Sequence, residues 1–173
     1  MRKLLVALAL VAVVFSVSVE NVNAETKNRL GVGAQYWKAI DDIDVDDVDD
    51  DGFSYYISYQ LRPASLIKFE LDLEMMPDGF AGAAEDVFAP QAYLILGSSI
   101  YAALGTGIYY TDGDFADDPF FAVKAGLDLH LLPYFYLDIN ASYRFDDWDS
   151  INDLDDDIST DTIMLGAAAR LQF

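Results

Sequence analysis

The 173-residue sequence contains no cysteine and only one histidine, His130. The absence of cysteine excludes disulfides, thiolate catalysis and cysteine-ligated zinc sites. Basic residues are scarce: 10 Lys and Arg stand against 30 Asp and Glu, a formal net charge of −20. A protein that binds nucleic acid by neutralising phosphates needs a basic face, so that class is excluded. A disordered acidic chain is excluded too, because 53% of the residues are hydrophobic and 14% are aromatic.

Long apolar runs are missing except near the start of the chain. Two basic residues precede an apolar run from Leu4 to Val14, and residues 22–24 (Val-Asn-Ala) supply the small residues that a signal peptidase reads. These features predict a secretory signal peptide over residues 1–24, because a spanning helix needs about 20 apolar residues. We expect the mature domain over residues 25–173.

Alternation of apolar and polar residues dominates the rest of the chain. In the clearest stretch, the apolar residues from Ile67 to Met75 alternate with Lys68, Glu70, Asp72 and Glu74. A period of two is typical of β-strands with one apolar face. Most of these stretches are close in length to the about 9–11 residues that a tilted β-strand needs to cross a bilayer. Eight strands are predicted, at about residues 29–38, 53–62, 67–75, 88–96, 100–110, 121–131, 135–145 and 163–173.

The connections between these strands differ in length in a regular way. Tight links at residues 62–65, 97–99 and 132–134 alternate with long links at residues 41–51, 77–87, 111–119 and 146–161. The long links hold 8, 3, 4 and 8 acidic residues, 23 of the 30, and no Lys or Arg. Short turns at one end and long loops at the other are typical of outer-membrane barrels, in which the apolar face meets lipid and the polar face lines the lumen.

We therefore predict an all-β fold, an eight-stranded antiparallel up-and-down transmembrane β-barrel with a polar network in its lumen. Buried charges must pair to offset desolvation. Strand direction predicts the pairs Asp138–Arg170 and Glu74–Arg144, with Lys124 or Lys68 serving Glu70 and Asp72. Two interpretations stay open, a polar plug that closes the barrel and a narrow channel whose acids select cations. The predicted network comprises Arg62, Lys68, Glu70, Asp72, Glu74, Lys124, Asp128, His130, Asp138, Arg144 and Arg170.

The sequence resembles a known family in four features. These are the signal peptide, the strand count, the loop asymmetry and the C-terminal Leu171-Gln172-Phe173. They are similar to the small eight-stranded outer-membrane barrels of the OmpA transmembrane-domain and OmpX type, over the whole mature chain. Ala168 stands where that family favours glycine. The resemblance implies location in the cell outer membrane, contact with outer-membrane lipid and lipopolysaccharide, and assembly by the machinery that reads a terminal aromatic residue. We expect a structural or surface-interaction barrel, or alternatively a narrow channel or small-molecule carrier.

Candidate catalytic residues are few. Asp128 lies two residues from His130 on the same strand face and could orient its imidazole. The sequence places no serine beside this pair as a nucleophile. A structural histidine bonded to Asp128 or Tyr136 is therefore expected, and no enzymatic activity.

The acidic links raise the question of metal binding. Residues 47–52 match the opening of a calcium loop, but the twelfth position is Ser58 instead of glutamate, which excludes an EF-hand. No resident cofactor is expected. A looser, weak site for Ca²⁺ or Mg²⁺ and a solvated acidic surface are the two interpretations. The candidate ligands are Asp47, Asp49, Asp51, Asp153, Asp155 and Asp157.

Aromatic residues near both ends of the strands are predicted to form girdles at the membrane interfaces. Those near the long links are Tyr36, Trp37, Tyr109, Tyr110, Phe120, Phe121 and Phe145, and those near the tight links are Phe69, Tyr101, Tyr134, Phe135 and Phe173.

Overall fold

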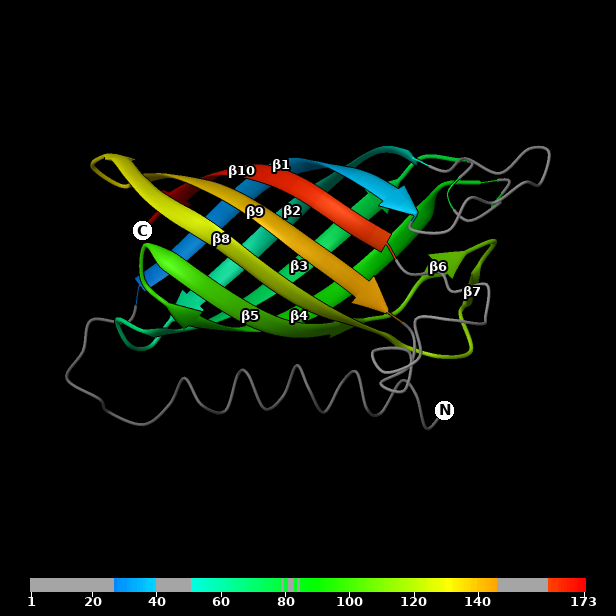
Figure 1. Cartoon of the computed structure of the whole chain (residues 1–173), viewed down its shortest axis with the longest axis horizontal. Coiled ribbons are helices and arrows are strands. Elements are labelled where there is room, and N and C mark those ends of the chain that lie inside the picture. The colour runs from blue at the N-terminus through cyan, green and yellow to red at the C-terminus, as the bar shows by residue number, and fades with distance from the viewer. Residues whose placement is uncertain (1–26, 40–50, 79, 81–82, 84, 146–161) are drawn as a thin grey trace.

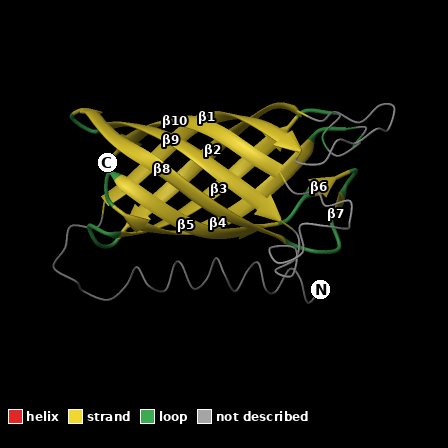
Figure 2. Ribbon diagram, in the orientation of Figure 1, coloured by secondary structure: helices red, strands yellow, loops and turns green. Residues whose placement is uncertain are grey.

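The computed structural model describes residues 27–39, 51–78, 80, 83, 85–145 and 162–173. The predicted signal peptide lies outside these residues. All regular structure in the described part is β-strand (Figure 2). The strands are β1 (Lys27–Ala39), β2 (Asp51–Arg62), β3 (Ile67–Met76), β4 (Val87–Gly97), β5 (Ile100–Gly107), β6 (Tyr110–Thr111), β7 (Asp114–Phe115), β8 (Phe120–Leu132), β9 (Phe135–Phe145) and β10 (Thr162–Gln172). No helix among the described residues is long and apolar enough to cross a membrane.

Eight of the described strands form a closed antiparallel barrel. Their order is β3-β2-β1-β10-β9-β8-β5-β4, and β3 pairs with β4 to close the ring. Closure leaves no unpaired sheet edge, which lipid requires because it offers backbone groups no hydrogen bonds. The C-terminus and the tight turns lie at one end of the barrel, called here the turn end, whereas β6 and β7 project from the other, the loop end (Figure 1). The predicted fold class is confirmed.

The inner and outer faces of the wall differ in chemistry. On β3, the side chains of Lys68, Glu70 and Glu74 are buried, whereas those of Ile67 and Leu73 are exposed. An exposed apolar belt around a charged interior is the reverse of a water-soluble protein. The belt therefore faces lipid. Other exposed members of the belt are Leu30, Val32, Phe53, Ile57, Leu94, Leu104, Leu127, Ile139, Leu165 and Leu171.

The fifth strand ends earlier than its apolar alternation predicts, at Gly107 instead of Tyr110. The N–H of Ile108 donates to the carbonyl oxygen of Pro90 at 3.2 Å, but proline has no N–H to return the bond, so the ladder stops. The chain then forms the β6–β7 hairpin inside the predicted long link. Its turn residues, Asp112 and Gly113, have φ values of 55° and 86°, as a type I′ turn requires.

Several aromatic residues predicted for the girdles lie inside the barrel instead. The side chains of Trp37, Tyr101 and Phe120 are 4%, 4% and 1% exposed. Each stands directly opposite a glycine on the next strand, and these glycines are Gly52, Gly126 and Gly107. Adjacent residues of a strand face opposite sides, so only one of Phe120 and Phe121 can meet lipid. The girdle prediction is wrong at these three positions because it used distance from the strand end without strand parity, and wrong at Tyr109, which packs against the buried Phe120 ring.

Candidate functional site

The lumen is the candidate site, because it buries five cationic and five anionic side chains of the described residues. Every one of them forms at least one ion pair of 3.2 Å or shorter. Buried ions carry a desolvation penalty of several kcal/mol each, which only close pairing offsets. The balanced set fills the lumen with paired charge. Its members are Arg29, Lys68, Lys124, Arg144, Arg170, Glu70, Asp72, Glu74, Asp128 and Asp138.

The layer nearest the turn end is built around Asp128 of β8. Its Oδ2 accepts hydrogen bonds from Arg29 Nη1 and Lys68 Nζ, both at 2.7 Å. The guanidinium carbon of Arg29 lies 3.4 Å from the ring centroid of Tyr136. Lys68 also donates to the carbonyl oxygen of Ser98 at 2.9 Å. Two cations thus share one carboxylate oxygen, which leaves this layer with an excess of positive charge.

The central layer is a chain of pairs that crosses the lumen. The Nζ of Lys124 lies 3.2 Å from both Glu70 Oε1 and Asp72 Oδ2. Arg170 joins Glu70 Oε2 at 2.8 Å to Asp138 Oδ2 at 2.9 Å. The Asp138–Arg170 contact is the one that strand direction predicts. Of the two cations considered for Glu70 and Asp72, Lys124 serves both.

The layer nearest the loop end is centred on the buried carboxylate of Glu74. It forms an ion pair with Arg144, again as strand direction predicts. It also accepts hydrogen bonds from Gln35, Ser54 and Gln91, the last at 2.6 Å. Four donors from four strands therefore converge on one carboxylate.

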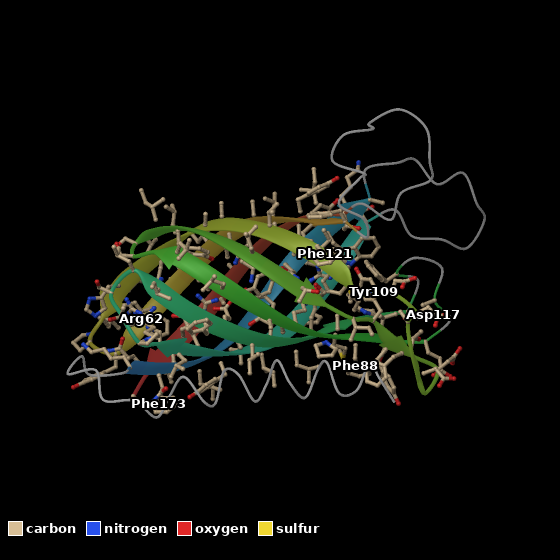
Figure 3. The ribbon with its side chains drawn as sticks, turned by 90° about the horizontal axis from the view of Figure 1, so that it is seen from below. Arg62, Phe88, Tyr109, Asp117, Phe121 and Phe173 are labelled. Atoms are coloured by element: carbon tan, nitrogen blue, oxygen red, sulfur yellow. The ribbon has the colours of Figure 1, made fainter. Side chains whose placement is uncertain are left out.

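An apolar cluster packs against this layer at the loop end of the lumen, where the Arg144 guanidinium lies 4.8 Å from the Phe120 ring centroid, and we call it the cap. Phe80, from the connection between β3 and β4, packs edge to face on Trp37 with ring centroids 4.9 Å apart. The Tyr109 ring lies 5.5 Å from Phe80 and 4.6 Å from Phe120. Tyr109 lies at the same end as Asp117 (Figure 3). The buried members of the cap are Trp37, Met76, Phe80, Val87, Ala89, Phe120 and Met164.

Two residues predicted for the lumen network lie at its turn-end rim. His130 is exposed and stacks on Tyr136, with ring centroids 4.6 Å apart. It lies beyond the last buried layer because β8 continues past the buried Asp128 to Leu132. Arg62 is half-buried at the last position of β2. The other nine residues of the predicted network are buried in the lumen.

Sequence reasoning missed Arg29, Gln35 and Gln91 as lumen residues. Small residues such as Gly31 and Gly33 weaken the alternation of β1, and Pro90 interrupts that of β4. The alternation of side chains between the two faces of a strand is the signal that would have found Arg29. Arg29 lies an even number of residues from Gln35 on β1, so both side chains point to the same face.

Five of the six acids predicted to bind Ca²⁺ or Mg²⁺, namely Asp47, Asp49, Asp153, Asp155 and Asp157, lie outside the described residues. The sixth, Asp51, is exposed at the start of β2 and accepts a hydrogen bond from the Tyr36 hydroxyl at 2.5 Å. Within the described ranges, no group of three or more His, Cys, Asp or Glu side chains could hold a metal ion.

No protein-family model and no curated protein matches the chain. Its fold is similar to solved outer-membrane barrels. Neisserial surface protein A is 16% identical over 86% of this chain and 97% of that one, with a TM-score of 0.53. The N-terminal β-barrel domain of Pseudomonas aeruginosa OprF is 10% identical over 86% of this chain and 100% of that one, with a TM-score of 0.51. Together with the lipid-facing belt, this likeness identifies the fold as that of an eight-stranded outer-membrane β-barrel.

Proposed function

We propose that this protein is a sealed outer-membrane barrel that anchors acidic loops at the cell surface. The observation that carries the proposal is the filled lumen. Ten buried charges pair with one another in three layers, and the apolar cap packs over the loop end. An eight-stranded barrel encloses just enough space for its own side chains. The inside of the barrel then serves stability, and the function lies in the surfaces that it presents.

The narrow channel is the weaker alternative. A channel of this kind would select cations through the acids at positions 70, 72 and 74 of β3. Each of these acids already holds an internal cation, Lys124 or Arg144. An entering ion would have to break these pairs and cross the cap before reaching them. An enzymatic role has no support either, because the single histidine stacks on Tyr136 at the turn end.

Orientation in the membrane is the first test of a surface role. The chain has no cysteine, so single cysteines give clean reporters. Asp114 and Ser65 are both exposed, the former in the β6–β7 hairpin at the loop end and the latter in the β2–β3 turn at the turn end. We expect a membrane-impermeant maleimide to label Asp114→Cys on intact cells and to label Ser65→Cys only after the outer membrane is opened. Labelling of Ser65→Cys on intact cells would contradict the proposed orientation.

We further propose that the acidic loops bind Ca²⁺ or Mg²⁺ weakly and so bridge to the anionic groups of lipopolysaccharide. Exposed acids gather at the loop end of the described chain, among them Asp51, Asp78, Glu85, Asp86, Asp112, Asp114, Asp117 and Asp118. Lys38 is the exposed cation at that end of β1. Like charges brought together at a membrane surface repel unless cations intervene. Hard cations prefer several oxygen ligands, which these loops supply.

Calcium is expected to raise the thermal midpoint of the folded barrel, because a ligand that binds only the native state stabilises it by mass action. The measurement is thermal unfolding in neutral detergent across a calcium titration. A variant with the acids of links 41–51, 77–87, 111–119 and 146–161 changed to their amides should not respond. Equal midpoint shifts in the parent and in this variant would contradict cation binding by the loops.

A further inference from the structure

The turn end of the barrel holds a pocket that the sealed-barrel function does not use. Its volume is about 380 Å³. Its walls come from four parts of the chain that the barrel brings together, namely the start of β1, the end of β2 with the turn that follows it, the start of β9 and the end of β10. The residues that line it are Lys27, Arg62, Pro63, Ala64, Ser65, Tyr136 and Gln172.

Two cations lie side by side on one wall of this pocket. Lys27 and Arg62 are directly opposed partners of β1 and β2, and both line the pocket. Like charges at directly opposed positions destabilise a sheet. The Nε atom of Arg62 is buried and has no hydrogen-bond partner in the structure. An arrangement of this kind becomes favourable when an anion lies between the two cations.

Neighbouring groups of the described chain offset the pair only in part, because Arg62 is attracted to Asp128 and hydrogen-bonds the Tyr136 side chain, while nothing comparable faces Lys27. The Arg29 guanidinium lies over the Tyr136 ring, and His130 stacks on the same ring. The carboxylate of Asp128 is already shared between Arg29 and Lys68. At the C-terminus, Phe173 continues the backbone ladder, exchanging hydrogen bonds of 2.9 and 3.3 Å with Asn28. The described side chains around the pocket at the turn end therefore carry net positive charge, whereas those at the loop end carry net negative charge.

We propose that this pocket binds a phosphate group that carries a small polar substituent. A phosphate ester presents acceptor oxygens and a charge of about −1 to −2, which two cations match. The Arg62 guanidinium can donate two parallel hydrogen bonds to it, and the Lys27 ammonium adds a compact point charge. Ser65 and the amide nitrogen of Gln172 supply neutral hydrogen-bonding groups for the substituent. Gln172 Oε1 accepts from Arg29 at 3.3 Å, and Tyr136 hydrogen-bonds Arg62. The volume exceeds what a phosphate group needs, which leaves room for that substituent.

The phosphate can come from a lipid headgroup of the periplasmic leaflet or from a soluble phosphate ester. Exposed apolar side chains surround the turn end, including Leu66, Leu132 and Phe173, and such residues face the membrane interface. Figure 3 shows Arg62 and Phe173 at this same end of the barrel. A headgroup at that level lies close to the pocket, so the experiment has one arm for each source.

The first arm uses soluble probes. The folded barrel in a phosphate-free neutral detergent is titrated with inorganic phosphate and with glycerol 3-phosphate, and binding is measured by calorimetry. We expect saturable binding that is tighter for the ester. Arg62→Gln and Lys27→Gln should each weaken it about tenfold or more, since each removes a charge-assisted hydrogen bond. The matched control is Lys38→Gln, which removes an exposed cation at the opposite end of β1 and should bind like the parent.

The second arm uses lipid nanodiscs of phosphatidylglycerol or phosphatidylcholine, with the Arg62 side-chain resonances as the readout. A shift in phosphatidylglycerol that glycerol 3-phosphate reverses identifies the headgroup as the ligand, and a response to the soluble ester alone identifies a soluble ligand. Migration of folded and heated samples on gels shows that each variant folds. No binding in either arm overturns the proposal. So does binding that is equal in the parent, Arg62→Gln and Lys38→Gln.

Discussion

Replacing Glu74 with leucine is expected to lower the free energy of unfolding of the barrel by about 3–5 kcal/mol, the usual cost of leaving a buried ion without its partner. The carboxylate holds Arg144 and accepts hydrogen bonds from Gln35, Ser54 and Gln91. Its loss leaves one buried guanidinium and three polar groups unsatisfied. The measurement is urea unfolding in lipid vesicles, followed by tryptophan fluorescence.

A double variant separates the charge from the packing. Glu74→Leu combined with Arg144→Met should recover most of the lost stability, because an apolar pair of similar volume replaces a buried ion pair at little net cost. The matched control is Glu85→Gln, which changes an exposed acid at the same end of the barrel and should alter stability by less than about 0.5 kcal/mol. If Glu74→Leu were as mild as Glu85→Gln, the paired lumen would not be what stabilises the barrel.

The second large effect is expected at Gly105, where alanine should cost about 1–3 kcal/mol, as overpacking in a filled core does. A Cβ at this position would lie 2.2 Å from Cδ1 of Tyr93, the directly opposed residue on β4. The Tyr93 ring has little freedom to move. Its hydroxyl donates to Gln91 at 2.6 Å, and its face lies 3.7 Å from Lys124 Nζ. The same unfolding experiment measures the loss.

A second substitution that relieves the clash serves as the control for this prediction. Gly105→Ala combined with Tyr93→Leu should be more stable than the sum of the two single effects, because the smaller side chain leaves room for the new methyl group. Ala102→Val, on the lipid-facing side of the same strand, should be close to neutral. Additive effects of the two changes would contradict a direct contact between Gly105 and Tyr93.

The wall of the barrel was predictable because alternation and loop length are local properties of the chain. On β3 a charge follows each apolar residue from Ile67 to Glu74, so both strand and inner face follow from sequence. On β1 the small residues Gly31 and Gly33 weaken the same signal, and Arg29 was missed. The early end of β5 depends on Pro90, which lies on the strand paired with it. A pattern read along one strand does not include that partner.

The lumen was predictable in composition and less so in its contacts. Strand direction alone brings Asp138 to Arg170 and Glu74 to Arg144. The choice of Lys124 over Lys68 for Glu70 depends on register around the whole ring. The cap depends on Phe80, which comes from a connection with no periodic pattern. Lys27 opposite Arg62 likewise emerges only from the register of β1 against β2.

Single-channel recording tests the sealed lumen most directly. The folded barrel is inserted into planar lipid bilayers in concentrated KCl, and insertion is verified by protease protection of the barrel. The paired charges and the apolar cap predict no conductance steps at any applied voltage that the bilayer tolerates. Discrete steps from the parent protein, whose cation selectivity falls in Glu70→Gln, would show an ion path past the β3 acids and contradict the account.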